Sequence, residues 1–486
     1  MEVLNSNISK KKARPVKVIQ FGEGNFLRGF VDYFIDIANE TNHFNGDIVL
    51  IKPIEYGNLD YFYEQDYRYT VSLRGLADGK EQILNRVITS VTDVVDAYKN
   101  YESYAGLAKL DTLRFVVSNT TEAGIVYDDT DRMDFNPPKS FPGKLTKFLY
   151  ERYLHFKGDP SKGLIILPVE LIDDNGIHLK EIVHKLVRLW NLEEDFTRWL
   201  TKSCTFCSTL VDRIITGYPK DEAERMWTEL GYTDHLIVTG EPFALWVIES
   251  DKEIEQEFPL KEAGLPVIFT DNQKPYKQRK VRILNGAHTS FALASFLAGN
   301  DYVLDSMSDM EVKQFMTKTI YEEIIPTLQL SKSDLTSFAE AVIERFHNPY
   351  IKHSLLSISL NSVSKWKARC LPSLLEYVER FSELPPRLTF SLAALLEFYS
   401  GREMKDGVLI GHRGNEEYPI KDDYEILMFF ERYSDDNLSE LIVKFLSNEA
   451  FWDQDLSKIP NLTEAITDYL TEIRTVGMRK SLSKLS

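Results

Sequence analysis

The first half of the chain alternates short, almost continuously apolar runs with segments of helical periodicity. After the first run, apolar side chains recur at helical spacing from Phe26 to Ile37 and form one face of an expected helix. Strands without polar alternation are buried on both faces, so the pattern predicts a mostly parallel sheet covered by helices. The runs that we expect to be strands are 16–21, 47–53, 69–73, 113–118, 163–169 and 266–271.

The second half has a different pattern, in which helical periodicity dominates from about Lys280 onward. The segment 331–346, for example, places Leu335, Phe338 and Val342 on one apolar stripe with Phe346. A length of 486 residues is compatible with two or three domains of about 150 residues. We therefore expect an α/β Rossmann-type domain over residues 1–275 and a mainly α-helical substrate and catalytic domain over residues 276–486.

A glycine-containing turn separates the first expected strand from the first expected helix. The sequence VIQFGEGNFLRGF places Gly22 and Gly24 there, where dinucleotide-binding domains hold a pyrophosphate on backbone N–H groups. The third glycine of the G-x-G-x-x-G motif is absent, because residue 27 is leucine. In this context the motif favours a nucleotide site, and a purely structural turn remains the alternative. Lys52 and Glu55 near the end of the second strand leave the choice between NAD and NADP open.

Residues 283–300 carry no formal charge, yet Lys280, Asn285 and His288 stand at the start of this stretch. Its length approaches the roughly 20 residues of a membrane span, but its polar residues and glycines favour a helix buried inside a globular protein. On an ideal α-helix, Asn285 and His288 lie about 140° and about 80° from Lys280. A lysine that donates a proton, with an amide and an imidazole on the carbonyl oxygen, suits ketone reduction. The alternative is a surface lysine and a structural histidine.

Charge and cysteine content restrict the function classes. With 57 Lys and Arg against 74 Asp and Glu, the net charge of −17 disfavours nucleic-acid binding. A small anionic substrate would therefore need a locally basic pocket.

Cys204 and Cys207 have CxxC spacing, but the chain has only three cysteines. This content favours ordinary packing in a reducing compartment over a redox pair or a zinc site. The basic run at residues 10–14 lacks the apolar segment of a signal peptide, and we expect it to be a solvated arm.

Several longer motifs occur in the order typical of polyol-specific long-chain dehydrogenases. They are FGEGNFLRGFVD from residue 21, QDYRYTVSLRG from residue 65, SNTTEAGI from residue 118, STLVDRIITGYP from residue 208 and KVRILNGAHT from residue 280. The chain therefore resembles the mannitol dehydrogenase family over nearly its whole length. Within that family, the resemblance is strongest to the members that act on a uronate.

The resemblance implies an NAD-dependent oxidoreductase that acts on CH–OH groups. The implied reaction is the reversible, NADH-dependent reduction of D-tagaturonate to D-altronate in cytoplasmic hexuronate catabolism, with fructuronate reduction or mannitol-type oxidation as alternatives. Lys280 would be the general acid in reduction and the general base in oxidation, while Asn285 and His288 would polarise the carbonyl. We expect no metal, no membrane and no nucleic-acid partner.

The resemblance also implies contacts with the ligands. The expected cofactor contacts are Val18, Ile19, Gln20, Phe21, Gly22, Glu23, Gly24, Asn25, Phe26, Leu27, Arg28, Gly29, Glu55, Asn119 and Thr120. Expected substrate contacts are Asp212 and, as candidates for holding a carboxylate, Lys352, His353 and Lys365. Two departures argue against mannitol and fit a uronate. Glu170-Leu171 replace the Asp-Asn pair of the mannitol enzymes, and Ser357 replaces an arginine.

Overall fold

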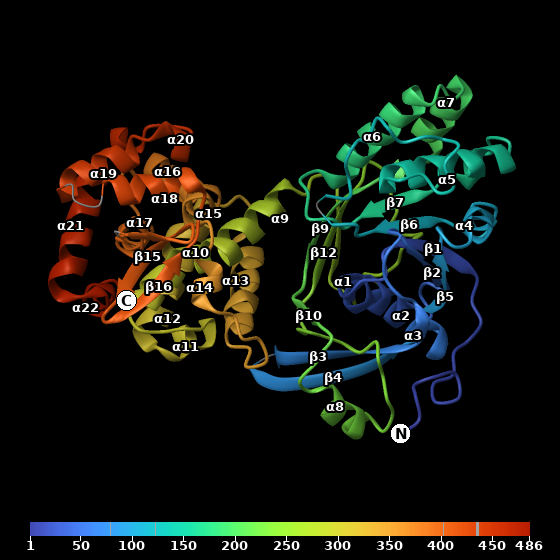
Figure 1. Ribbon diagram of the computed structural model, residues 1–486, viewed down its shortest axis with the longest axis horizontal. Coiled ribbons are helices and arrows are strands. Elements are labelled where there is room, and N and C mark those ends of the chain that lie inside the picture. The colour runs from blue at the N-terminus through green and yellow to red at the C-terminus, as the bar shows by residue number, and fades with distance from the viewer. Residues whose placement is uncertain (78, 122, 402, 434–436) are drawn as a thin grey trace. The chain divides into compact units, whose positions relative to one another are not determined.

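The computed structural model of the protein describes residues 1–77, 79–121, 123–401, 403–433 and 437–486 (Figure 1). Residue 122, inside the SNTTEAGI motif, is therefore outside the described residues. The chain divides into two compact units, Met1–Gln273 and Lys274–Ser486. The expected fold class is confirmed, because the first unit is a Rossmann-type α/β structure and the second is mainly helical.

The centre of the first unit is a six-stranded sheet in which all neighbouring strands are parallel. Its order, β5-β2-β1-β6-β7-β8, is the 3-2-1-4-5-6 order of Rossmann domains when the strands are counted along the chain. The strands are β1 (Val16–Phe21), β2 (Asp47–Lys52), β5 (Val91–Asp96), β6 (Phe115–Ser118), β7 (Ile165–Pro168) and β8 (Thr205–Phe206).

Both faces of this sheet are buried, in two separate hydrophobic clusters. Successive residues of a strand point to opposite faces, so each strand contributes alternately to the two clusters. One cluster receives Val18, Ile48, Leu50, Phe115, Val117, Ile165 and Leu167. The other receives Ile19, Phe21, Val49, Ile51, Val116 and Ile166. This arrangement explains why the strands have no polar alternation in the sequence.

Helices cover both faces (Figure 1). The first face is covered by a helix that starts after the glycine turn as α1 (Asn25–Leu27), continues through a π-helical segment (Arg28–Asp32) and ends as α2 (Tyr33–Glu40). The second face is covered by α4 (Tyr101–Leu107), α5 (Phe141–His155), α6 (Asn175–Leu189) and α7 (Glu194–Ser203).

Two of the expected strands form but lie outside the parallel sheet, which corrects the expectation of a single main sheet. The run at 69–73 belongs to a sheet of order β10-β11-β3-β4, and the run at 266–271 to one of order β13-β12-β9. Periodicity identifies a strand but not the strands that it will pair with.

The strands of these two additional sheets are β3 (Tyr69–Ala77), β4 (Lys80–Ile88), β9 (Ser208–Asp212), β10 (Ile215–Gly217), β11 (Val238–Gly240), β12 (Leu245–Glu249) and β13 (Val267–Thr270). The remaining helical segments of this unit are α3 (Asp60–Glu64), a 3-10 turn (Pro160–Lys162) and α8 (Ala223–Leu230).

The expectation of a solvated N-terminal arm is wrong. Leu4 is fully buried and its backbone N–H donates to the carbonyl of Thr233 over 2.8 Å. Lys11 and Arg14 form ion pairs with Asp47 at 3.2 and 3.3 Å. The basic run is therefore held by a carboxylate at the start of β2, a partner that local sequence does not reveal.

The second unit is built around one continuous helix. It begins as α9 (Lys274–Arg279), passes through a π-helical segment (Lys280–Asn285) and continues as α10 (Gly286–Leu297). Almost every residue of α10 is buried, which is typical of a helix that is apolar on all sides and enclosed by protein. It packs against α12 (Met310–Lys318), α14 (Leu355–Ile358), α15 (Ser362–Arg369), α17 (Pro386–Phe398) and α22 (Met478–Ser483).

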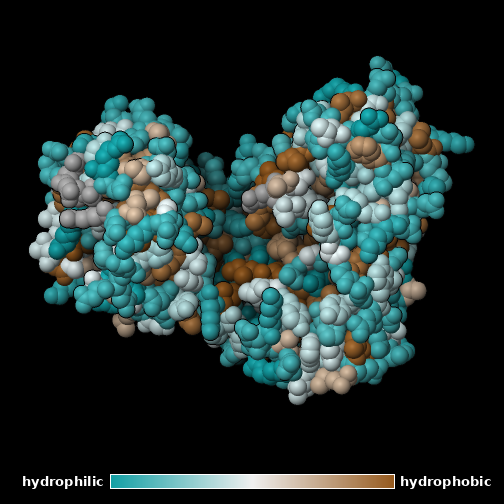
Figure 2. All heavy atoms as spheres, in the orientation of Figure 1, coloured by the Kyte–Doolittle hydropathy of each residue, from teal (hydrophilic) through white to brown (hydrophobic). Residues whose placement is uncertain are grey.

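The expected buried helix is thus confirmed over the charge-free stretch. Within the described part of the chain, no helix combines the length and apolar character that a bilayer crossing needs. In the view of Figure 2, hydrophilic side chains cover most of the outward surface of each unit. The expected stripe at 331–346 is confirmed as well, since Leu335, Phe338, Val342 and Phe346 are buried on α13 (Lys332–Phe346).

A small antiparallel sheet in the second unit was not expected from the sequence. It consists of β14 (Glu403–Lys405), β15 (Val408–Arg413) and β16 (Glu416–Ile420). The other helical segments of this unit are α11 (Val303–Ser308), a π-helical segment (Thr319–Ile324), a 3-10 turn (Ile325–Thr327), α16 (Leu371–Phe381), α18 (Tyr424–Arg432), α19 (Leu438–Leu446), α20 (Glu449–Trp452), a 3-10 turn (Leu456–Lys458) and α21 (Leu462–Val476).

Candidate active site

The turn after β1 requires glycine at position 22 but not at position 24. The φ of Gly22 is +124°, and a Cβ atom there would lie 2.8 Å from Leu27 Cδ1 and 3.2 Å from the backbone oxygen of Asn119. A Cβ atom at Gly24 would meet no heavy atom within 4 Å, and its φ of −70° and ψ of 166° suit any residue. Gly22 therefore shapes the turn, whereas the space beside Gly24 is open.

This turn lies at the point where the strand order of the parallel sheet reverses. β1 and β6 are parallel neighbours, and Phe21 is opposite Ser118. The glycine turn and the segment after Ser118 therefore leave the sheet at the same edge. In open α/β sheets, ligands bind in the crevice at this position. The structure thus places Asn119, half-buried like Thr120, next to Gly22.

Glu170 holds this edge together, a role that sequence reasoning missed. Its side chain is buried and accepts hydrogen bonds from the Ser118 hydroxyl at 3.1 Å and from the N–H and hydroxyl of Thr120 at 2.9 and 3.0 Å. Burial raises the pKa of the carboxyl, although these hydrogen bonds oppose the shift. The sequence did contain a signal for this role, because Glu170 departs from the Asp-Asn pair of the mannitol enzymes.

The helix that follows the turn uses Arg28 inside the protein. The guanidinium lies over the rings of Tyr69 and Phe62, at 5.2 and 5.7 Å, and donates to the Leu236 carbonyl and to Asn25 Oδ1. Gly29 allows close packing, because a Cβ atom there would lie 2.6 Å from Ile215 Cδ1. Gly29 therefore serves the close approach that the missing third glycine of the motif usually provides.

The other predicted cofactor residues divide by exposure. Glu23 and Phe26 are half-buried, and Asn25 is exposed with Gly24 at the end of the turn. The remaining ones are buried, with side chains in the two hydrophobic clusters or the sheet interior, so these side chains are not accessible to a cofactor. They are Val18, Ile19, Gln20, Phe21 and Leu27.

Lys52, at the end of β2, is neutralised by an internal ion pair. Its side chain is 1% exposed, and its ammonium lies 2.8 Å from Asp96 Oδ2. The same ammonium donates to the carbonyls of Glu55 and Gly57 at 3.1 and 3.3 Å. Lys52 therefore holds the loop that follows β2, and Glu55 stands exposed on that loop.

In the second unit, the predicted proton donor lies in a π-helical turn. Lys280 and Asn285 are the first and last residues of this turn, and both are half-buried. Because π-helices bond residue i to residue i+5, they have more residues per turn than an α-helix, and residues five apart differ less in direction. Lys280 and Asn285 are thus closer in direction than the angle of an ideal α-helix suggests. Such turns occur frequently at functional sites.

His288 follows on the first turn of α10 and is held as a neutral imidazole. Its ring stacks on Phe346 with centroids 4.1 Å apart and meets the His353 ring edge-on at 5.1 Å. Burial lowers the pKa of His288 well below its usual value, and the nearby charges of His353, Arg345 and Arg369 lower it further. Its Nε2 atom is buried and has no hydrogen-bond partner in the described part of the protein. A buried polar atom without a partner is uncommon in folded proteins and marks His288 as a candidate functional residue.

The three predicted carboxylate-binding residues occupy different environments. Lys352 is exposed, and His353 is half-buried beside His288. Lys365, on α15, is also half-buried and donates to the Ile358 carbonyl at 2.9 Å. Burial lowers the pKa of Lys365, as does the charge of Arg369. Arg369, which sequence reasoning missed, ends α15 and donates to Thr289 Oγ1 at 3.3 Å.

Asp212 is the last residue of β9 and is buried in the first unit. It pairs with Leu245 in the antiparallel ladder between β9 and β12. The predicted site residues are therefore distributed over both units.

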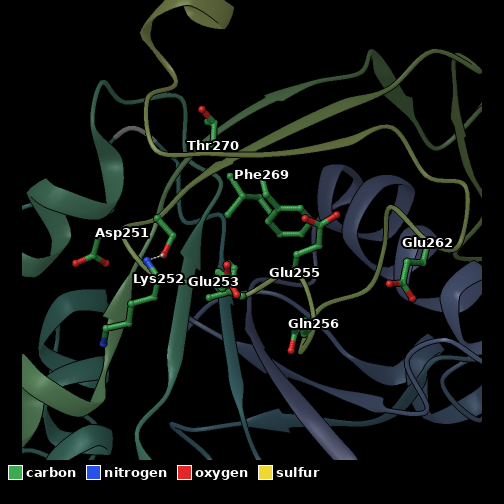
Figure 3. Close-up of a pocket in the computed structure, with 11 residues that line it drawn as sticks. Asp251, Lys252, Glu253, Glu255, Gln256, Glu262, Phe269 and Thr270 are labelled. Atoms are coloured by element: carbon green, nitrogen blue, oxygen red, sulfur yellow. Dashed lines mark hydrogen bonds between the residues drawn. The ribbon is translucent and has the colours of Figure 1, made fainter.

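A cavity of about 430 Å³ in the first unit contains none of the predicted site residues (Figure 3). Its lining is acidic, with Asp251, Glu253, Glu255 and Glu262 around a single lysine, Lys252. An acidic cavity is a poor site for an anionic sugar acid or a pyrophosphate.

The cysteines behave as packing residues. Cys204 and Cys207 are buried free thiols, and burial raises their pKa to about 11 and about 12. They are therefore protonated at neutral pH and poorly suited to redox chemistry or metal binding. Among the described residues, no group of histidine, cysteine and carboxylate side chains is arranged to hold a metal ion.

Two family models match the chain. Residues 16–262 match the mannitol dehydrogenase Rossmann domain, and residues 272–474 match the mannitol dehydrogenase C-terminal domain. Proteins named altronate oxidoreductase are similar over full length. The identity is 44% to the protein of Yersinia enterocolitica and 46% to that of Klebsiella pneumoniae, with 100% of both chains covered in each case. It is 42% to the protein of Bacillus subtilis, over 100% of this chain and 98% of the relative.

Solved structures support the fold. A Pseudomonas fluorescens mannitol 2-dehydrogenase, in ternary complex with NAD and D-mannitol, has a TM-score of 0.69 at 21% identity, over 100% of this chain and 99% of its own. A D-sorbitol dehydrogenase in substrate-free form has a TM-score of 0.80 at 21% identity, over 99% of this chain and 100% of its own.

Proposed function

The chain belongs to the mannitol dehydrogenase family and is an oxidoreductase that acts on CH–OH groups, and we propose that it interconverts D-tagaturonate and D-altronate with NADH and NAD. The observation that carries this proposal is the 44% identity, over the full length of both chains, to proteins named altronate oxidoreductase. In the direction of reduction, the ketone gains a hydride and a proton and becomes the secondary alcohol, and NADH becomes NAD.

The first unit is the proposed cofactor-binding unit. Gly22 makes the turn, the open space beside Gly24 allows a pyrophosphate to approach the backbone, and Asn119 and Thr120 line the same edge of the sheet. When bound, the dinucleotide would supply or accept the hydride. NAD is preferred over NADP in this proposal, because Lys52 is neutralised by Asp96 and Glu55 would repel a 2′-phosphate.

The second unit is the proposed source of the proton. Lys280 would donate it to the carbonyl oxygen in reduction and remove it from the hydroxyl in oxidation. Asn285 and His288 would hold the same oxygen by hydrogen bonds. His288 suits this role, because its neutral imidazole carries one N–H and its Nε2 has no hydrogen-bond partner among the described residues.

Substrate recognition is proposed for Asp212 and for the basic residues Lys352, His353 and Lys365. A buried carboxylate such as Asp212 accepts hydrogen bonds from sugar hydroxyls, which matches a polyhydroxylated substrate. The basic residues match a carboxylate. Because the protein carries a net charge of −17, an anionic substrate depends on such local cations.

The test is a comparison of substrates with the purified enzyme. We expect NADH oxidation, followed by absorbance, to have its highest kcat/KM with tagaturonate and lower values with fructuronate and fructose. The same assay with NADPH should be slower at equal concentration. A highest kcat/KM with fructuronate would favour a fructuronate reductase, and one with fructose would favour a mannitol-type dehydrogenase, the two alternatives within this family.

A further inference from the structure

Arg369 occupies a position in the second unit from which it can reach a ligand held at His288. We propose that Arg369 is a specificity-determining residue that binds the carboxylate of the substrate, with Lys365 and His353 beside it. This inference rests on the proposed function, since it names the group that recognises the acid end of a sugar acid.

The end of α15 packs directly on the first turn of α10. A Cβ atom added to Gly286 would lie 3.1 Å from the backbone oxygen of Arg369, and the Cys370 thiol lies 3.6 Å from the Gly286 carbonyl. The guanidinium of Arg369 reaches further along α10 and donates to Thr289 Oγ1 at 3.3 Å. Arg369 is thereby anchored one residue after His288, and Thr289 is itself buried.

Lys365 and Arg369 lie one helical turn apart, at i and i+4 on α15, so their side chains lie on one face of the helix. Both are half-buried, and neither forms an ion pair within the described residues. Arg369 has five N–H donors and uses one of them in the hydrogen bond to the neutral hydroxyl of Thr289. Lys365 donates to the neutral carbonyl of Ile358.

The acidic residue that acts on Lys365 already has hydrogen-bond partners of its own. Asp422, which interacts electrostatically with Lys365, accepts hydrogen bonds from the Tyr399 hydroxyl and from the backbone N–H groups of Val363 and Asp423. Burial lowers the pKa of both Lys365 and Arg369, and the charge of Arg369 lowers the pKa of Lys365 further. Half-buried cations that form no ion pair make a site that an anion stabilises.

The chemistry of the site favours a carboxylate. An arginine fork forms two parallel hydrogen bonds to one carboxylate, which a lysine does not. The imidazole of His353 lies against His288, with ring centroids 5.1 Å apart, so the basic group is continuous with the proposed carbonyl-binding residue. A keto sugar acid carries its carboxylate and its carbonyl on one short carbon chain. Neighbouring side chains, here Arg369 and His288, can therefore recognise the two groups.

The experiment compares the full-length wild-type enzyme with Arg369→Met, using NADH oxidation with a keto-uronate and with an uncharged ketohexose. We expect the KM for the keto-uronate to rise about tenfold or more, equivalent to about 1.4 kcal/mol or more, with little change for the ketohexose. Arg369→Lys should recover part of the loss, because it keeps the charge but not the fork. Where turnover of the ketohexose is slow, inhibition constants replace KM. Those of altronate, which is charged, and altritol, the corresponding uncharged polyol, are then compared between wild type and Arg369→Met.

Lys367→Met is the matched control, because Lys367 is on the same helix but its ammonium is paired with Asp453 at 2.6 Å. It should leave both KM values unchanged. Equal changes for charged and uncharged ligands in Arg369→Met, with an active wild-type enzyme, would overturn the role of Arg369 alone. A wild-type enzyme that reduces ketohexoses but no keto-uronate would instead overturn the proposed function, and this inference with it.

Discussion

His288 and Lys280 lie on one continuous helix, and their side chains suit different parts of the proposed chemistry. The pKa of His288 is lowered by burial and by neighbouring cations, so its imidazole is neutral at pH 7 and serves as a hydrogen-bonding group. A neutral imidazole is a poor proton donor. The proton in the proposed reaction is therefore assigned to Lys280.

The first prediction at this scale is that Lys280→Ala lowers kcat by about 10²–10⁴-fold, the usual value of general acid–base catalysis. NADH affinity, measured by fluorescence titration, should stay within about twofold. Lys313→Met, which removes an exposed lysine of α12, is the control and should be fully active. Near-normal turnover of Lys280→Ala would show that another group donates the proton.

The second prediction concerns the two lysines proposed to hold the carboxylate. Lys365→Met should raise the KM for tagaturonate about tenfold, since a hydrogen bond to a charged group contributes about 1.5–3 kcal/mol. Lys352→Met should have a smaller effect, because Lys352 is exposed and solvent screens its charge. Steady-state kinetics of both variants with charged and uncharged ketones test this order. A larger effect at Lys352 would reverse the assignment.

The third prediction is a pH dependence of stability that arises at Asp32. Burial raises the pKa of this carboxyl from 3.8 to about 7, against the hydrogen bond that it accepts from Tyr69. Between these two pH values the unfolded chain has lost the proton that the folded protein keeps. The free energy of unfolding should therefore fall as pH rises through this window.

Asp32→Asn should remove this contribution, because the amide does not ionise and its oxygen still accepts the Tyr69 hydrogen bond. Chemical denaturation between pH 5 and pH 8 measures the difference in slope between the variant and the wild type. Asp468→Asn, at an exposed position of α21, should keep the wild-type slope. Identical slopes for Asp32→Asn and wild type would show that Asp32 is ionised throughout.

At the scale of elements, the glycine turn separates a ligand role from a folding role. Gly24→Val should abolish NADH binding with little loss of stability, because the protein itself leaves the space beside Gly24 empty and its backbone angles suit valine. Gly22→Ala should instead lower the thermal stability, since its φ is +124° and Leu27 Cδ1 lies 2.8 Å from the added carbon. Calorimetry and NADH titration of both variants distinguish the two roles. Normal NADH binding by Gly24→Val would remove this turn from the cofactor site.

At the scale of the whole molecule, we propose different tasks for the two compact units. The first unit has its own hydrophobic clusters, and the second is built around α10. We expect thermal unfolding to depart from two-state behaviour, with a calorimetric enthalpy above the van't Hoff value. NADH at about 100 times its Kd should add about 2.7 kcal/mol to the stability of the unit that binds it. Hydrogen exchange should place that protection in residues 1–273, and protection confined to residues 274–486 would contradict the proposed division of tasks.

The sequence by itself determined the features that depend on neighbouring residues. Strand β1, the need for glycine at position 22 and the buried character of α10 follow from local periodicity and from the composition of short segments. The family motifs likewise indicated Lys280 as a candidate for catalysis. Neighbouring residues carry this information because hydrophobic period and turn geometry are properties of a few consecutive peptide units.

Only the tertiary structure decided the features that depend on distant partners. It placed β3 and β13 in sheets of their own, fixed the N-terminal arm on Thr233 and Asp47, and shifted the directions of Lys280 and Asn285 by a π-helical turn. It also brought Arg369 to Thr289, 80 residues earlier in the chain. A sequence pattern does not encode such pairs one by one, because the free energy that selects them is that of packing the whole unit.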